Sequence, residues 1–431
     1  MKAMLSVNEL VESSSAKLPR EIKAFIAKEV LSTNKDPMNA TKVFVNQLEK
    51  LEFNRQRQVI NASGTILHTN LGRAPIESNH VARYTNIEYD LVKNQRGERN
   101  SYLNALMKQL LGAEDVAFVN NNASSLYIAL RMLKQKYSIE NVIISRGEII
   151  EIGGSYRLPE IILESDLKLI EVGTTNKTKP KDYEEALVKN QNSILLKVHR
   201  SNYSITGFTE ETSIEELNSL KIKHNTFLIH DLGSGLVVDD NFLNKFNLSI
   251  FSDEPKVQSS LKSGVDIVMF SGDKLFGSSQ SGILAGKEDL IKNIKSFSLF
   301  RTYRCSASVL YELEITAEKY VSKNELEIPF WKIISESYEV LKNRIEKVTE
   351  NSNLNFQILN GESVVGGGTL PNKFITSPIL EIEGTPESIL KQFINYDIPI
   401  IPRIQNNKVI LDFRTVFPDQ DIHIKHALQN L

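Results

Sequence analysis

The sequence contains very little cysteine and no long apolar run. Cys305 is the single cysteine among 431 residues, which excludes a disulfide framework and a zinc site built from several cysteines, and fits a reducing cytosol. No stretch approaches the ~18–20 apolar residues that span a bilayer. Residues 1–10 lack the apolar core of a secretory signal. We therefore expect a cytoplasmic protein with no membrane segment.

An excess of charge of one sign is also absent. The chain has 51 Lys and Arg against 53 Asp and Glu, a net charge of −2. No overall positive field attracts nucleic acid, so any such contact must be local. The apolar and charged fractions, 41% and 24%, are typical of globular proteins and exclude disordered and collagen-like classes. The length predicts two or three domains, one of them large.

The apolar pattern divides the chain into three regions. Residues 1–58 carry apolar side chains at helical spacing and a slightly basic charge, which predicts a small helical domain. Residues 59–300 alternate short apolar runs with helical stretches, the pattern of an α/β domain with a mostly parallel sheet covered on both faces. Residues 301–431 predict a small C-terminal α+β domain that includes one long helix, 329–348. The expected buried strands are 116–119, 142–144, 169–172, 194–198, 227–229 and 267–270.

A lysine and an aspartate each follow a predicted buried strand. Lys274 lies among small residues after the run 267–270, where partial desolvation makes an amine nucleophilic enough for Schiff-base chemistry. Asp231 follows the run 227–229, and such a carboxylate keeps the ring nitrogen of pyridoxal phosphate protonated. Taken singly, each is as well explained by a surface turn. Together, with no metal-ligand cluster in the sequence, they predict a pyridoxal 5'-phosphate site.

A third polar segment separates a predicted strand from a predicted helix. Asn122, Ala123 and Ser124 precede the helical run 126–133. Asn and Ser cap helices, and the exposed N–H groups at a helix start also bind phosphate. In chain order, the phosphate turn, the aspartate and the lysine match the large domain of aspartate-aminotransferase-like, or fold-type I, enzymes.

Four arginines suggest oxyanion binding. Arg73, Arg99, Arg301 and Arg304 come from three parts of the chain. Guanidinium groups bind oxyanions with paired hydrogen bonds. The alternative for any single arginine is an ordinary surface salt bridge.

Long segments of the chain resemble bacterial L-seryl-tRNA(Sec) selenium transferase, a fold-type I family also called selenocysteine synthase. The likeness extends from about residue 56 into the C-terminal domain, in the same order. The segments are INASGTILHTNLGRAP (60–75), NIEYDL (86–91), SRGE (145–148), EIGGS (151–155), EVGTTN (171–176), KVH (197–199), SNY (201–203), GFTEE (207–211), GGG (366–368) and LDFRT (411–415).

The resemblance implies an activity and partners. The protein would convert L-seryl-tRNA(Sec) to L-selenocysteyl-tRNA(Sec) with selenophosphate, through an aminoacrylyl intermediate. Lys274 would hold the cofactor, with Asp273 preceding it as in the family, and the four arginines would surround selenophosphate. A homodecamer, a pentamer of dimers, is implied, with residues 1–58 contacting the serine-charged tRNA(Sec).

Two other functions remain open from the sequence. A related pyridoxal-phosphate lyase acting on a small amino acid or amino sugar would share the cofactor residues but would not need the N-terminal extension. A tRNA-binding relative without turnover is the other possibility. Tyr102, Arg200 and Ser279 stand where the family usually has histidine, threonine and proline.

Overall fold

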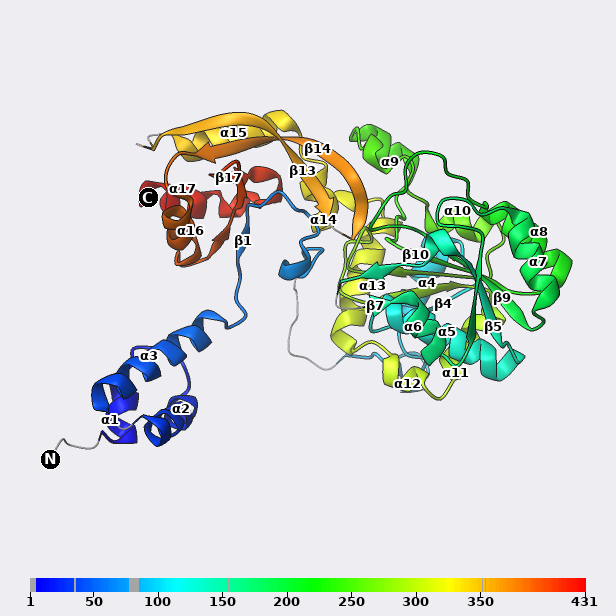
Figure 1. Ribbon diagram of the computed structural model, residues 1–431, viewed down its shortest axis with the longest axis horizontal. Helices are drawn as coiled ribbons and strands as arrows, with labels where there is room; N and C mark the ends of the chain where they lie inside the picture. Colours follow the sequence, from blue (N-terminus) through cyan, green and yellow to red (C-terminus); the bar gives the residue numbers. More distant parts are fainter. Residues whose placement is uncertain are drawn as a thin grey trace. The chain divides into compact units, whose positions relative to one another are not determined.

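The computed structural model describes residues 5–34, 36–76, 85–153, 156–350, 352, 354–366 and 368–431. Gly154, Ser155 and Gly367 of the family-like segments lie outside these ranges. Packing divides the chain into two units, Met1–Val59 and Ile60–Leu431 (Figure 1). In the described part of the chain, no helix is both long enough and apolar enough to cross a bilayer.

The first unit is helical, as the sequence predicts. Its helices are α1 (Val7–Glu12), α2 (Arg20–Thr33) and α3 (Pro37–Phe53). Asp36 caps α3 by accepting the N–H of Asn39, and proline occupies the first helical position, where its missing N–H costs nothing. The helices share a small core of their own, formed by Leu10, Val11, Ala27, Val30, Ala40, Phe44 and Leu48.

The second unit is built on a seven-stranded sheet. The strand order is β4-β12-β11-β10-β9-β5-β8, and every strand except β12 runs in the same direction. All six strands expected from the sequence are present, which confirms the mostly parallel α/β prediction. The strands are β4 (Asp115–Val119), β5 (Asn141–Ser145), β8 (Lys168–Val172), β9 (Ser193–Val198), β10 (Leu228–Gly233), β11 (Ile267–Ser271) and β12 (Gly282–Gly286).

Both faces of this sheet are buried. Ile143 and Leu195 belong to one apolar cluster, whereas their neighbours Val142, Ile144 and Ile194 belong to another. Side chains alternate between the two faces of a strand, so helices must cover both. The helices of this part are α4 (Ser101–Leu111), α5 (Asn122–Tyr137), α6 (Leu158–Glu164), α7 (Pro180–Lys189), α8 (Ile214–His224), α9 (Asp240–Lys245), α10 (Val257–Lys262), α11 (Glu288–Ser296), α12 (Phe300–Tyr303) and α13 (Ala307–Val321).

The C-terminal part has a four-stranded antiparallel sheet, ordered β13-β14-β17-β16. Its long hairpin, β13 with β14, reaches the large sheet in Figure 1. Helices α14 to α17 complete this part, and β1 pairs with β15 beside it. The elements are α14 (Pro329–Ile334), α15 (Tyr338–Thr349), α16 (Pro386–Ile394), α17 (Asp421–Gln429), β1 (Ile60–Asn61), β13 (Phe356–Gly366), β14 (Thr369–Ile382), β15 (Ile400–Ile401), β16 (Arg403–Gln405) and β17 (Lys408–Asp412).

Two details differ from the sequence-based expectation. The single helix expected over 329–348 is two helices, because buried Arg414 binds the carbonyl oxygens of Ile334 and Glu336, and Ser337 caps α15. In addition, α13 and α14 pack into the core of the large sheet, while Ile60 packs with the C-terminal part. Elements on both sides of residue 300 therefore share the core of the large sheet, whereas the two units divide at residues 59 and 60.

Candidate active site

Asp231 and Lys274 lie at the same edge of the large sheet. Strands β10 and β11 are parallel neighbours, with Asp231 opposite Met269, so their carboxyl ends meet. Lys274 follows the end of β11 in a tight turn, and both side chains are buried. Ligands of open α/β sheets bind at this edge.

The amine of Lys274 is buried but uncommitted. Within the described residues, its Nζ makes no hydrogen bond or ion pair. Burial, followed by the nearby positive charge of Arg73, lowers the pKa of Lys274. A side chain at Gly233 would place its Cβ 3.7 Å from Nζ, and one at Gly368 would place it 4.0 Å away. The glycines leave space around an amine that is nucleophilic when neutral.

Asp231 is held by a side chain from the phosphate turn. Asn122 Nδ2 donates a 2.7 Å hydrogen bond to Asp231 Oδ1. Burial raises the pKa of Asp231 to about 6, against the opposing effects of Asn122 and Lys274. A cationic group bound beside this carboxylate would restore its ionised form.

The first turn of α5 lies where the sequence predicts a phosphate-binding turn. The side chain of Asn121 caps the helix by accepting the N–H of Ser124 at 2.9 Å. The N–H groups of Asn122 and Ala123 point out of the helix start, where they have no partner within the helix. Asparagine at the cap position explains why the helix begins at residue 122, four residues before the apolar run that predicted it.

Several buried polar atoms at this edge have no hydrogen-bond partner. They are Asn122 Oδ1, Ser125 Oγ and Ser234 Oγ. Buried polar atoms without partners are rare in folded proteins and indicate a polar ligand or water. Together with the uncommitted amine and the helix start, they fit pyridoxal phosphate. No group of three or more metal-ligating side chains occurs among the described residues.

Arg73 lies next to the lysine turn. Its guanidinium donates a 2.7 Å hydrogen bond to Asp273 Oδ2, and the backbone N–H of Ala74 donates to the Asp273 carbonyl at 3.2 Å. Arg73 itself has a φ of +65°, a left-handed conformation that is uncommon for a residue with a side chain. The loop that follows β1 is therefore fastened to the residue preceding Lys274.

The other predicted arginines do not join Arg73 in one group. Arg99 and Arg304 converge on Glu88 Oε1, at 2.8 and 3.5 Å. Arg301 is exposed on α12, and no ion pair connects it to a described residue. In a single chain, therefore, Arg99 and Arg304 form a pair at Glu88. Arg73 and Arg301 belong to neither this pair nor a second one.

Three polar residues near the site were missed by the sequence reading. His199 Nε2 lies 3.2 Å from Glu254 Oε2; the charge of His199 acts on Asp231 and that of Glu254 on Lys274. Tyr156 is half-buried, and its partial burial, followed by the charge of Asp231, raises its pKa. His199 directly follows a predicted strand and could have been found by that signal. Glu254 lies in a loop, and no pattern in the sequence points to it.

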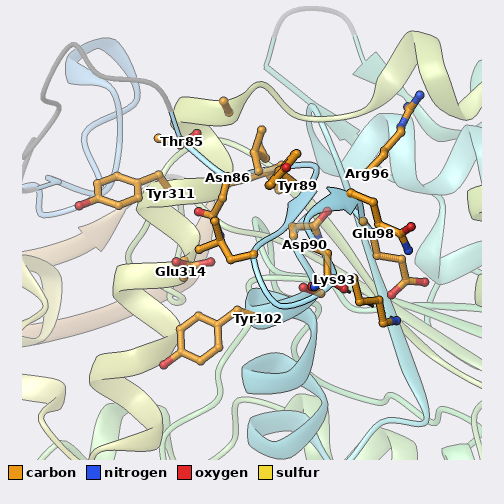
Figure 2. Close-up of a pocket in the computed structure, with 18 residues that line it drawn as sticks. Thr85, Asn86, Tyr89, Asp90, Lys93, Arg96, Glu98, Tyr102, Tyr311 and Glu314 are labelled. Atoms are coloured by element: carbon orange, nitrogen blue, oxygen red, sulfur yellow. Dashed lines mark hydrogen bonds and ion pairs between the residues drawn. The ribbon is translucent and has the colours of Figure 1, made fainter.

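An open cavity of about 1070 Å³ lies beside the arginine pair. In Figure 2, Tyr102, Tyr311 and Glu314 lie along one side, and Arg96 and Glu98 along the other. Its walls come from the hairpin of β2 (Tyr89–Asp90) and β3 (Gln95–Arg96), the start of α4, and α13.

The residues that depart from the family pattern lie in three places. Tyr102 donates a 2.8 Å hydrogen bond to Glu318 on α13 and lines the open cavity. Arg200 pairs with Glu211 at 3.2 Å, and the carbonyl of Ser279 accepts a hydrogen bond from Ser281. None of these contacts involves Lys274 or Asp231.

A solved structure shares this fold. The structure of D-glucosaminate-6-phosphate ammonia-lyase matches with a TM-score of 0.58 and 18% identity, over 89% of this chain and 97% of that one. At this identity the likeness shows the fold alone. Fold and site together define a fold-type I, aspartate-aminotransferase-like protein, as the sequence predicts.

Sequence comparison identifies the family within this class. The model of the L-seryl-tRNA selenium transferase family (SelA) matches residues 59–417. L-seryl-tRNA(Sec) selenium transferase of Campylobacter fetus subsp. fetus is 38% identical over 411 residues, covering 92% of this chain and 90% of that protein. The Alkaliphilus oremlandii protein of the same name is 40% identical over 382 residues, covering 84% and 79%. The chain belongs to this family, which confirms the resemblance seen in the sequence.

Proposed function

We propose that the protein converts L-seryl-tRNA(Sec) to L-selenocysteyl-tRNA(Sec) with selenophosphate, using pyridoxal 5'-phosphate. The observation that carries this proposal is the amine of buried Lys274, which has no bonding partner among the described residues and lies beside the Asp231–Asn122 pair. The chain's membership of this family supports it. Because its substrate is an aminoacyl-tRNA, we place the protein in the cytoplasm.

Different residues at the sheet edge would bind different parts of the cofactor. Lys274 would hold it through its amine, Asp231 would pair with the ring nitrogen, and the first turn of α5, Asn122 to Ser124, would bind the phosphate. When bound, pyridoxal phosphate supplies an electron sink for a carbanion at the Cα of an amino acid.

Lys274 and Asp231 then have complementary electrostatic roles. Burial lowers the pKa of Lys274, so its Nζ is able to accept the proton that leaves the seryl Cα. Asp231 would keep the ring nitrogen of the bound cofactor protonated through ionic pairing, while Asn122 fixes the orientation of the carboxylate. Asp273, which precedes Lys274, is ion-paired with Arg73, and its negative charge acts on Lys274.

Selenophosphate is the natural ligand for the arginines. The seryl carboxylate is esterified to tRNA, so Arg73, Arg99, Arg301 and Arg304 are not needed to bind it. A multiply charged donor matches several guanidinium groups, each forming charge-assisted hydrogen bonds. We assign these four arginines to the donor.

The proposal also includes the tRNA and further copies of this chain. The helical unit, residues 1–58, would contact the tRNA, since its basic character is local on a chain that is acidic overall. We propose a homo-oligomer, a decamer made of five dimers, on the basis of the family resemblance. Light scattering of the purified protein would test this assembly.

The decisive experiment combines the purified protein with pyridoxal phosphate, seryl-tRNA(Sec) and selenophosphate. We expect selenocysteyl-tRNA(Sec) from the natural protein and none from Lys274→Ala. Borohydride should also fix the cofactor on Lys274, detected by peptide mass. A cofactor fixed on another lysine would contradict the site, whereas ammonia release from free amino acids or amino sugars without tRNA would favour a lyase.

A further inference from the structure

Three arginines share one carboxylate in this structure. Glu88 Oε1 accepts from Arg99 at 2.8 Å and from Arg304 at 3.5 Å, and Oε2 accepts from Arg96 at 3.1 Å. Hydrogen bonding to Arg99, with the surrounding positive charges, lowers the pKa of Glu88, so the carboxylate is ionised. One negative charge therefore faces three positive charges.

The hydrogen-bonding capacity of these arginines is not exhausted. Arg99 Nε is buried and has no partner, while its NH2 group donates to the Cys305 carbonyl at 3.0 Å. The 3.5 Å contact of Arg304 is long for a charge-assisted hydrogen bond. A carboxylate has two oxygens in one plane and leaves part of this positive group unmatched. A tetrahedral oxyanion, with more oxygens and more charge, is a better match.

The cluster adjoins the phosphate turn. Arg304 forms a β-bridge with Val119, and the N–H of Asn120 donates to the Tyr303 carbonyl at 2.8 Å. Val119 and Asn120 lead directly to α5. Of the three arginines, the exposed Arg96 also lines the open cavity (Figure 2), whereas Arg99 and Arg304 do not.

We propose that Glu88 is an internal counter-anion that occupies the donor arginines and selects for multiply charged tetrahedral oxyanions. The proposal rests on the function proposed above, which assigns Arg99 and Arg304 to selenophosphate. A singly charged anion that displaces Glu88 only exchanges one negative charge for another. A dianion or trianion gains the additional attraction of the unmatched guanidinium groups. Displacing Glu88 costs the same free energy for every anion, so only an anion that gains this additional attraction binds tightly.

The test measures binding of inorganic phosphate and of acetate to the full-length, cofactor-loaded protein by calorimetry. We expect Glu88→Gln, a nearly isosteric change, to bind phosphate about tenfold more tightly, which is the order of one charge-assisted hydrogen bond. Acetate should gain by a similar factor, because both anions must displace Glu88 in the natural protein. Glu98→Gln removes the same charge from an exposed neighbour that makes no ion pair with these arginines among the described contacts, and should change neither affinity.

Unchanged or weaker phosphate binding in Glu88→Gln would overturn the proposal, because it would mean that Glu88 only positions the arginines. Glu88→Ala must shift affinity in the same direction, and the cofactor absorbance of each variant reports correct folding. The two proposals fail separately. Selenium transfer by the natural protein with no affinity gain in Glu88→Gln would reject only the role of Glu88. An affinity gain in a protein that transfers no selenium would reject the proposed function.

Discussion

Asp231 is a carboxyl group whose burial opposes its ionisation. Its pKa is about 6 in the folded chain, whereas the ordinary value is 3.8. The unfolded chain therefore releases this proton at lower pH than the folded chain does. As pH rises from about 4 to 6, the folded protein without cofactor loses stability, and the loss persists above pH 6.

The Asp231→Asn variant removes this cost. At ~1.4 kcal/mol per pKa unit, the cofactor-free variant should gain about 2–3 kcal/mol in free energy of unfolding at pH 8 relative to the natural chain. Near pH 4 the difference should vanish. Urea unfolding at both pH values measures this, and Cα-proton exchange with the cofactor bound should slow strongly. A pH-independent difference would contradict the assigned pKa, and a normal exchange rate would contradict the role at the ring nitrogen.

A substitution at Arg304 tests whether hydroxyl elimination and selenium transfer depend on different residues. It contacts Glu88 rather than Asp231 or Lys274 among the described residues. We expect Arg304→Ala to lose selenium transfer by one to several orders of magnitude, at ~1.4 kcal/mol for each tenfold, while still eliminating the hydroxyl of seryl-tRNA(Sec). Product analysis with and without selenophosphate distinguishes the steps.

The matched control for Arg304 is Arg157→Ala, which removes an exposed arginine paired with Glu151. It should affect neither step. Equal loss of elimination and transfer in Arg304→Ala would show that this arginine serves the amino-acid substrate or the fold.

At the scale of elements, the sequence predicted the six strands of the large sheet that are rich in branched apolar residues. It missed β12, the strand of that sheet that is not. Strand β12 begins and ends with glycine, a residue that is depleted in strands. Its neighbours explain the composition. A Cβ on Gly282 would come within 2.2 Å of the Asn121 carbonyl oxygen, and one on Gly286 within 2.1 Å of that of Asp266. Such tertiary contacts produce no periodic pattern in the sequence from which the strand could be predicted.

In the site, too, some residues follow a pattern visible in the sequence, whereas others are brought together only by tertiary contacts. Lys274, Asp231 and the phosphate turn were predictable because each follows a buried strand, so topology brings them to one edge. The partners of the arginines were not predictable, since Glu88 and Cys305 approach them through loops. Gly368 was noted only as part of the family-like segment 366–368, although the hairpin of β13 and β14 places it so that an added Cβ would lie 4.0 Å from Lys274 Nζ.

Strand β12 fixes the start of α5. We expect Gly282→Ala to displace Asn121 and Ser125, because the added methyl group would lie 2.2 Å from an atom of each. The variant should lose cofactor affinity at least tenfold, measured by absorbance titration, together with thermal stability. Gly153→Ala is the control, since a Cβ at this exposed glycine meets no atom within 4 Å. Unchanged cofactor affinity in Gly282→Ala would place the phosphate elsewhere.

At the scale of the whole molecule, the two units have separate cores. The helical unit packs around Phe44 and Leu48, and neither residue belongs to the cores of the rest of the chain. A chain beginning near Arg57 should therefore fold and keep its cofactor absorbance. It should lose affinity for tRNA(Sec), measured by filter binding, while phosphate binding by calorimetry stays unchanged as the control. Full tRNA affinity after the deletion would assign recognition to the second unit.

The pairing of β1 with β15 has a consequence for synthesis on the ribosome. Ile60 and Asn61 are made long before their partners Ile400 and Ile401. Pairing of such distant segments is slow, because closing the long intervening loop costs entropy before any contact forms. The loop after β1, which carries Arg73 to Asp273, therefore lacks this anchor until residue 401 has been made. We expect a nascent chain to assemble the large sheet and the lysine turn before the site is completed.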